Sequence, residues 1–398
     1  MDFVSDRVKN LAVSATLAMS QKSAELKAAG VDVINMSVGE PDFNTPDFIK
    51  EGAKKAIDDN FSRYTPVAGY ISLREAICEK LKRENGLDFD PAQIVVGNGA
   101  KQELANVLLA TVNPGDEVII PVPAWVSYVE MVKLAEGVTV QIHAGVEQDF
   151  KITPDQLEAA ITPRSRVLML NSPSNPTGSV YSYEELKGLA EVLERHPEIL
   201  VLADDIYEHI NYTGGAHSIA EFPALRDRVV IVNGVSKAYA MTGWRIGYMA
   251  GPLAVAKAVT KLQGQYTSGA SSIAQKAAEA AYRGNQDCVE EMRKAFERRR
   301  DLIVDLAKEI PGWRVNNPQG AFYLFPEVSA LIGKKANGKE LKSSGDYVMY
   351  LLEEAHVAAV DGDAFCAPGY LRLSYATSDE NIREAMRRIR EATLRLTD

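Results

Sequence analysis

The stretch RVVIVNGVSKAYAMTGWRIGY, residues 228–248, opens as an apolar, β-branched run and then turns into polar residues and glycines. An apolar run of this length is typical of a strand buried on both faces of a parallel sheet. Lys237 and Arg245 follow the run, where the strand would end. Because open α/β sheets bind ligands outside the carboxyl ends of their strands, this stretch predicts both a fold class and the position of a functional site.

Five more short apolar runs lie upstream of this stretch, at residues 93–97, 116–121, 138–143, 166–171 and 199–204. Longer segments with apolar residues at helical spacing, such as 182–196, separate several of them. Alternation of this kind indicates βαβ units. We therefore expect an α/β fold built on a mostly parallel, doubly wound sheet.

The two ends of the chain predict a second, smaller unit. Residues 285–310 form a long amphipathic pattern, and strand-like and helical segments follow it to the C-terminus. We therefore expect a large domain over residues 45–286, which carries the sheet and the ligand. A small α+β domain would be formed by the N-terminal arm, residues 1–44, together with residues 287–398.

Composition and charge narrow the classes of partner. The chain has 398 residues, a formal net charge of −10 and no basic run longer than residues 298–300, so neither nucleic acid nor a membrane is an expected partner. No uncharged apolar run approaches the roughly 20 residues that cross a bilayer. Three widely spaced cysteines, Cys78, Cys288 and Cys366, argue against a disulfide framework and a Cys-rich metal site. We expect a cytoplasmic protein that binds small molecules and no metal.

A glycine-containing segment, GNGAKQEL, follows the first run. If a helix begins there, the amides of Ala100 and Lys101 lie at its positive end and are suited to bind a phosphate. The third glycine of a dinucleotide-binding fingerprint is absent after Gly97 and Gly99, which weakens the case for a dehydrogenase. Taken alone, the segment is equally consistent with an ordinary tight turn.

Two later strand ends carry an aromatic residue and an amide. Trp125 follows the second of these upstream runs and would cover a flat ring by stacking, although a position in the core explains it as well. Asn175 lies in the cluster NSPSNPTG after the fourth run. It would donate a hydrogen bond to a ligand or simply belong to a turn.

Charged residues follow the last two runs. Asp204 comes directly after five apolar residues, and a buried carboxylate requires a positive partner such as a protonated ring nitrogen. Tyr207 lies three residues further on. Burial and a nearby positive charge would lower the pKa of Lys237 and make it an amine nucleophile, while Arg245 is suited to grip a phosphate with two hydrogen bonds. A surface lysine is the alternative for Lys237.

One ligand accounts for these residues together. Its phosphate would lie at the glycine-containing turn, with Ser236 and Arg245, and its ring would lie against Trp125. Its ring nitrogen would face Asp204, and its aldehyde would react with Lys237. Pyridoxal 5′-phosphate has all four groups, so we infer it as the cofactor of the large domain.

Several segments of the chain resemble the fold-type-I, pyridoxal-phosphate-dependent aminotransferases of class I, and they are most similar to bacterial aspartate aminotransferases. The resemblance covers nearly the whole chain, through SATLAM, SVGEPDFNTP, RYTPVAG, NSPSNPTG, DDIYEH, SKAYAMTGWRIGY and LRLSYATS. It implies a ping-pong reaction, in which an amino acid leaves its amine on the cofactor and departs as a 2-oxo acid. A second 2-oxo acid then takes the amine.

The resemblance also implies a role for each cofactor-binding residue. Lys237 binds the cofactor aldehyde covalently and moves a proton between the substrate Cα and the cofactor. Asp204 keeps the ring nitrogen protonated and Trp125 stacks on the ring. Tyr207 and Asn175 hydrogen-bond its phenolic oxygen. The remaining contacts hold the phosphate, and they come from Ser236, Arg245, the amides of Ala100 and Lys101, and Tyr64 of the partner subunit.

The substrate site is implied in the same way. Arg372 would clamp the substrate α-carboxylate with two hydrogen bonds and leave the Cα–H bond perpendicular to the cofactor ring. Without the resemblance, a solvated charge on an edge strand explains Arg372 about as well. The other residues expected to contact substrate are Gly39, Lys101, Trp125 and Asn175.

Substrate choice rests on Lys101, with the hydroxyls of Ser14 and Thr16. In this family they imply aspartate and 2-oxoglutarate as substrates, with oxaloacetate and glutamate as products. A prephenate or aromatic amino acid aminotransferase, or a pyridoxal-phosphate lyase, is the alternative enzyme. A ligand-sensing regulator would need a DNA-binding domain, for which the residues before Gly39 are too few. Active sites built across two subunits imply a homodimer.

Overall fold

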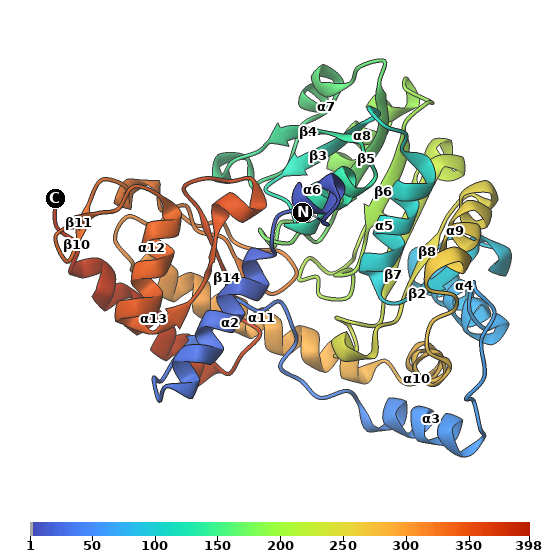
Figure 1. Ribbon diagram of the computed structural model, residues 1–398, viewed down its shortest axis with the longest axis horizontal. Coiled ribbons are helices and arrows are strands. Elements are labelled where there is room, and N and C mark those ends of the chain that lie inside the picture. The colour runs from blue at the N-terminus through green and yellow to red at the C-terminus, as the bar shows by residue number, and fades with distance from the viewer. Residues whose placement is uncertain (1–2) are drawn as a thin grey trace.

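A seven-stranded sheet forms the centre of the computed structural model, which describes residues 3–398 (Figure 1). Residues 1 and 2, which fall in the expected small domain, lie outside the described residues. The strand order is β2-β8-β7-β6-β5-β3-β4. The strands are β2 (Ile94–Gly97), β3 (Glu117–Val122), β4 (Val138–His143), β5 (Ser165–Asn171), β6 (Leu200–Asp204), β7 (Val229–Gly234) and β8 (Gly247–Ala250).

Six of these strands coincide with the predicted apolar runs, and the mostly parallel sheet is confirmed. Only β8 is antiparallel to its neighbours, β2 and β7. The sequence does not predict β8, because its four residues, GYMA, are too few to show a strand pattern after a glycine-containing loop. Apart from β8, the carboxyl ends of the strands therefore meet at one edge of the sheet.

Helices cover both faces of this sheet (Figure 1). Successive residues of β6 show the reason, since Val201 and Ala203 belong to one apolar cluster and Leu202 belongs to another. Helices α5, α6 and α9 share the cluster of Leu202, and α4, α8 and α10 share the opposite one. The helices of this region are α3 (Asp47–Asp58), α4 (Ile71–Asn85), α5 (Ala100–Thr111), α6 (Ser127–Leu134), α7 (Pro154–Ala160), α8 (Tyr183–Glu194), α9 (Leu253–Tyr266) and α10 (Ser272–Arg283).

Both ends of the chain combine in a second unit, on the left in Figure 1. Strand β1 pairs in parallel with β12, with Ile34 opposite Val357, and one apolar cluster joins them to α11 and α13. Strands β13, β14 and β9 form a separate antiparallel sheet. The elements of this unit are α2 (Ala15–Ala28), β1 (Ile34–Asn35), α11 (Asp287–Lys308), β9 (Tyr323–Leu324), β10 (Lys335–Ala336), β11 (Lys339–Glu340), α12 (Ser344–Tyr350), β12 (Val357–Ala358), β13 (Val360–Asp361), β14 (Leu371–Ser374) and α13 (Asp379–Leu394). Helix α1 (Asp6–Lys9) lies instead beside α6 (Figure 1), where Arg7 Nη2 is 2.6 Å from Glu136 Oε1.

No helix in the described part of the chain is long and apolar enough to cross a membrane. All three cysteines are free thiols and partly buried. Burial raises the pKa of Cys78 to about 11, so this thiol stays protonated and unreactive at neutral pH.

Candidate active site

A cavity of about 380 Å³ lies at the carboxyl ends of the strands, next to residues of the second unit. All the residues predicted for the site except Tyr64 line it. They are Gly39, Ala100, Lys101, Trp125, Asn175, Asp204, Tyr207, Ser236, Lys237, Arg245 and Arg372. Ser14 and Thr16 of the N-terminal arm line it as well.

Lys237 lies three residues beyond the end of β7 and points across the cavity. Its Nζ donates a hydrogen bond to the carbonyl oxygen of Gly39 at 2.7 Å. Burial lowers the pKa of Lys237 to about 8; the Glu40 carboxylate opposes this shift, and the guanidinium groups of Arg372 and Arg245 add to it. The neutral, nucleophilic amine is therefore accessible near neutral pH.

Asp204 is the last residue of β6 and is 5% exposed. Its Oδ2 accepts a hydrogen bond from the Tyr128 hydroxyl at 2.6 Å, and its Oδ1 accepts one from the Ile206 amide at 3.4 Å. Burial raises the pKa of Asp204 to about 6, although both hydrogen bonds and Lys237 oppose the shift. A positive ligand group beside this carboxylate would favour its charged form.

Sequence reasoning missed Tyr128, although it stands three residues after Trp125 in VPAWVSY. The two rings lie edge to face with centroids 5.5 Å apart. The spacing from Trp125 could have indicated that Tyr128 also faces the cavity, because residues three apart at the start of a helix share one face. Tyr128 thus contacts both the Trp125 ring and the Asp204 carboxylate.

Arg372, on β14, is 1% exposed. Its two terminal nitrogens donate to Asn175 Oδ1 at 2.8 Å and to the Ser37 carbonyl oxygen at 2.6 Å. The Nε atom has no hydrogen-bond partner among the described residues. The guanidinium lies 4.6 Å from the Tyr323 ring centroid. The structure thus excludes a solvated edge arginine and presents a fixed, buried cation to the cavity.

Tyr323, on β9, is a second residue that sequence reasoning missed. Its hydroxyl lies 2.7 Å from the Tyr207 hydroxyl. A Cβ added at Gly39 would lie 2.3 Å from the same Tyr323 oxygen, so only glycine leaves room for this pair. The pair could not be read from the sequence because 116 residues separate Tyr207 from Tyr323.

Asn171, the last residue of β5, is a third missed residue. Its Nδ2 donates to the Asp204 carbonyl oxygen at 2.7 Å, and its Oδ1 accepts from the Asn175 amide at 2.8 Å. It opens the NSPSNPTG cluster, so its place at a strand end was the available signal. Asn171 therefore holds the backbone of two predicted site residues, Asp204 and Asn175.

The glycine-containing turn does open a helix, α5, whose first residue is Ala100. As in any helix, the first amides have no acceptor within the helix and present a positive end. A Cβ added at Gly247 would lie 2.1 Å from the Ala100 nitrogen, so only glycine lets β8 approach this end. Arg245 reaches the same place, with Nη2 3.1 Å from the Asn98 carbonyl oxygen.

Lys101 and Ser236 are the remaining predicted residues that line the cavity. Lys101 Nζ lies 4.9 Å from the Trp125 ring centroid. Burial lowers the pKa of Lys101, and the positive charge of Arg245 adds to this. Ser236 is 7% exposed and lines the cavity, as Arg245 does. The cavity therefore offers an anion-binding end, an aromatic wall, a buried carboxylate and an amine.

Tyr64 lies away from this cavity and is fully exposed. It lines a shallow surface groove with residues 62–65 and 269–272. A single chain therefore does not bring Tyr64 to the predicted site.

Glu103, one turn into α5, is a buried acid behind the anion-binding end. It is 0% exposed, and its Oε2 has no hydrogen-bond partner within residues 3–398. Burial raises its pKa to about 8, and a long hydrogen bond from Asn106 only partly opposes the shift. At neutral pH the carboxyl is protonated, so it adds no negative charge beside the helix start.

We expect Glu103→Gln to stabilise the protein near neutral pH. The unfolded state releases the proton above a pKa of about 4.3, whereas the folded state keeps it up to about pH 8. Wild-type stability therefore falls as pH rises between these values. Glutamine does not titrate, so its advantage in unfolding free energy should grow by about 1.4 kcal/mol per pH unit in this window. Urea unfolding across the window measures this; an advantage that is constant with pH would contradict it.

Known proteins are similar to this chain in sequence and in fold. A model of the family Aminotransferase class I and II matches residues 31–389. An aspartate/prephenate aminotransferase from Cereibacter sphaeroides is 51% identical over 395 residues, which are 98% of this chain and 98% of that protein. An aspartate aminotransferase from Geobacillus stearothermophilus is 50% identical over 96% of this chain and 97% of its own length.

Solved structures agree with these relatives. The aspartate aminotransferase from Rhizobium meliloti has a TM-score of 0.96 at 45% identity, with both chains covered over 100%. The enzyme from Thermus thermophilus with maleate has a TM-score of 0.91 at 41% identity, covering 98% of this chain and 100% of its own. The chain therefore belongs to the class I and II aminotransferases.

Proposed function

We propose that this aminotransferase binds pyridoxal 5′-phosphate in the cavity and transfers the amino group of aspartate to 2-oxoglutarate by a ping-pong reaction. The observation that carries the proposal is the meeting of three groups in one cavity: the amine of Lys237, the carboxylate of Asp204 and the guanidinium of Arg372. Burial shifts the pKa of each of these groups in the direction of its neutral form. Perturbed groups that converge in a cleft are typical of a catalytic site.

The residues fit each group of this cofactor. The start of α5 and Arg245 suit its phosphate, and the Trp125 ring suits its flat pyridine. The buried Asp204 carboxylate suits a protonated ring nitrogen, and Lys237 suits the aldehyde. When bound, the cofactor supplies an electron sink for the negative charge that develops at the substrate Cα.

Side chains of the protein move the proton, bind the substrate and hold the cofactor ring nitrogen. The Lys237 amine takes the proton from the substrate Cα and would pass it to the carbon of the cofactor's aldehyde group, because its lowered pKa makes it a base near neutral pH. Asp204 holds the ring nitrogen in its protonated form. Arg372 binds the α-carboxylate while Asn175 and the Ser37 carbonyl keep the guanidinium in place. This orientation selects the Cα–H bond for cleavage.

Lys101 supports a dicarboxylic substrate, because its ammonium group lies at the cavity wall beside Trp125. Maleate, found with the Thermus thermophilus enzyme, is itself a four-carbon dicarboxylate. Prephenate is the second candidate acceptor, supported by the relative from Cereibacter sphaeroides, which is named an aspartate/prephenate aminotransferase.

The amino-acid half-reaction tests this choice. We expect aspartate and glutamate, added singly to the cofactor-loaded protein, to convert the cofactor absorbance band rapidly to that of its amine form. Phenylalanine and tyrosine should react more slowly, because they lack the carboxylate that Lys101 would bind. Lys101→Ala should reduce this difference and leave the absorbance of the loaded protein unchanged. No conversion by either aspartate or glutamate would sink the assignment.

A homodimer with shared active sites is part of the proposal, supported by the full exposure of Tyr64 in the single chain. We expect Tyr64→Ala to weaken cofactor binding by about tenfold, as for one lost phosphate hydrogen bond. Hybrid dimers of Tyr64→Ala and Lys237→Ala chains contain one site with both residues intact. They should recover tight binding and activity at that site. Hybrids that behave as the average of the two variants would refute shared sites.

We further propose residues 45–286 as the cofactor-binding domain and residues 1–44 with 287–398 as the small domain. The pairing of β1 with β12 and the apolar cluster they share with α13 support this division. A cytoplasmic location stays a prediction from the sequence.

A further inference from the structure

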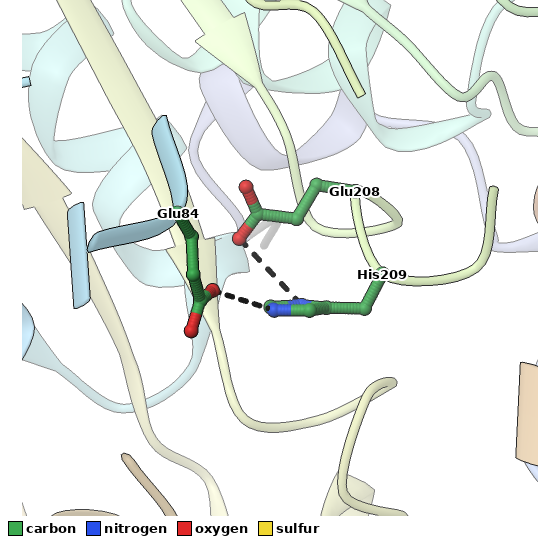
Figure 2. Close-up of side chains that lie close together, drawn as sticks. All are labelled: Glu84, Glu208 and His209. Atoms are coloured by element: carbon green, nitrogen blue, oxygen red, sulfur yellow. Dashed lines mark hydrogen bonds and ion pairs between the residues drawn. The ribbon is translucent and has the colours of Figure 1, made fainter. Parts of the chain in front are cut away.

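A polar cluster lies between α4 and the loop that follows β6. Figure 2 shows the carboxylates of Glu84 and Glu208 directed toward the ring of His209. His209 Nε2 lies 2.9 Å from Glu84 Oε2, and its Nδ1 lies 3.6 Å from Glu208 Oε1. Glu84 belongs to α4, whereas Glu208 and His209 directly follow Tyr207 of the active site.

These three side chains have the composition of a cation site, but an ammonium already lies among them. Lys80, also on α4 and fully buried, forms an ion pair with Glu208 Oε1 and lies 3.5 Å from Glu84 Oε2. Its Nζ also donates to Asn85 Oδ1 at 2.9 Å. The cluster is therefore an ion-pair network whose positive charge comes from the protein.

Glu208 is the centre of this network and is 8% exposed. Burial would raise its pKa, but the charges of Lys80 and His209 and the hydrogen bonds from Lys80 and Asn85 together lower it. The Tyr239 ring lies 6.3 Å from the His209 ring on one side. In such surroundings a paired carboxylate is held firmly, because breaking a buried pair leaves an uncompensated charge.

Glu208 connects two parts of the active site. We call residues 204–209 the Asp204 loop and residues 234–237 the Lys237 loop. Glu208 belongs to the Asp204 loop, and its Oε1 accepts a hydrogen bond of 2.6 Å from Asn233 Nδ2, at the end of β7. The Oδ1 of Asn233 in turn accepts from the Gly234 amide, the first residue of the Lys237 loop, at 2.7 Å.

We propose that the Lys80–Glu208 ion pair is a positioning element that acts through Asn233 to set the spacing between the Asp204 loop and the Lys237 loop. The inference rests on the proposed function, in which these two loops hold opposite ends of one cofactor. Lys80 anchors Glu208 to α4, a helix that lies outside the cavity lining. The carboxylate then presents one fixed acceptor to Asn233, and the two loops keep one separation.

Two asparagines that donate to the same carboxylate provide matched variants. Asn233→Ala removes the link to the Lys237 loop and leaves the Lys80–Glu208 pair in place. Asn85→Ala removes the other donor, whose Nδ2 lies 2.9 Å from Glu208 Oε2, and leaves the link from Glu208 to Asn233 and the Lys237 loop in place. Asn233→Ser keeps an acceptor for the Gly234 amide but is too short to donate to Glu208, so it tests the link if Asn233→Ala does not fold.

We expect both asparagine variants to lower the melting temperature, because each removes hydrogen bonding to a buried charge. Asn233→Ala removes the bond to Glu208, and Asn85→Ala removes bonds to both Glu208 and Lys80. Only the Asn233 variants should raise the dissociation constant for pyridoxal phosphate and lower kcat, each by about tenfold. They should also shift the midpoint of the pH titration of the bound cofactor's absorbance band. Asn85→Ala should stay within about twofold of wild type in both constants.

Two results would overturn the inference. Equal changes in cofactor affinity for Asn85→Ala and the Asn233 variants would mean that the network stabilises the fold without positioning the loops. Changes confined to the melting temperature would mean the same. A wild-type protein that binds no pyridoxal phosphate would instead overturn the proposed function, together with the inference built on it.

Discussion

Replacing Lys237 by alanine is expected to lower kcat by about 10⁴-fold or more, because one change removes both a covalent anchor and a proton-transfer group. The variant should still fold. Lys237 is partly buried with a lowered pKa, and its removal relieves the desolvation of an amine. Steady-state kinetics measures the loss. The absorbance spectrum with added pyridoxal phosphate reports whether the covalent link forms.

An exposed lysine provides the control for this experiment. Lys54 pairs with Glu51 on the surface of α3, and Lys54→Ala should leave kcat and the spectrum unchanged. A Lys237→Ala protein with the wild-type absorbance spectrum would show that another lysine carries the cofactor.

The second large effect is expected for Arg372→Ala, in kcat/KM for aspartate. Loss of one partner of a buried, hydrogen-bonded charge pair costs about 2–5 kcal/mol, which corresponds to roughly 30- to 4,000-fold. Arg372→Lys keeps the charge without the two-pronged geometry and should recover only part of the loss. Both variants should bind cofactor with a normal spectrum, because Arg372 is not expected to contact it.

A primary amine without a carboxyl group separates the clamp from a general disturbance of the site. Such an amine has nothing for Arg372 to bind, so wild type and Arg372→Ala should react with it at similar rates. A comparable loss with the amine would mean that Arg372 acts by holding Asn175 and Ser37 in place, rather than by binding substrate.

The site residues that follow strands of the large sheet were predictable from the sequence, because the topology alone brings the ends of these strands together. Asp204 and Lys237 follow apolar runs, and neighbouring parallel strands place such residues at one edge. Asn175 and Trp125 follow two more runs for the same reason. The hydrogen bond from Tyr128 to Asp204 was not predictable in this way, since it joins residues 76 apart in the sequence.

The second unit was harder to predict for a related reason. Arg372 alternates with apolar neighbours, a pattern that also describes an edge strand with a solvated charge. Only the packing of β14 between β13 and β9 makes it a central strand and buries the guanidinium. Likewise, Tyr64 lies on the surface of one chain, and no property of a single chain shows what a partner would cover.

The pairing of β1 with β12 has a consequence for synthesis of the protein. The N-terminal arm leaves the ribosome first, yet Ile34 must wait for Val357 to appear before its strand has a neighbour. Met36 likewise receives its hydrogen bond from Ser374, near the end of the chain. Contacts of such long range form slowly, and chain segments that await them stay open to wrong partners. The large sheet can therefore form while the chain grows, but the cavity is completed only after residues 357–374 have been synthesised.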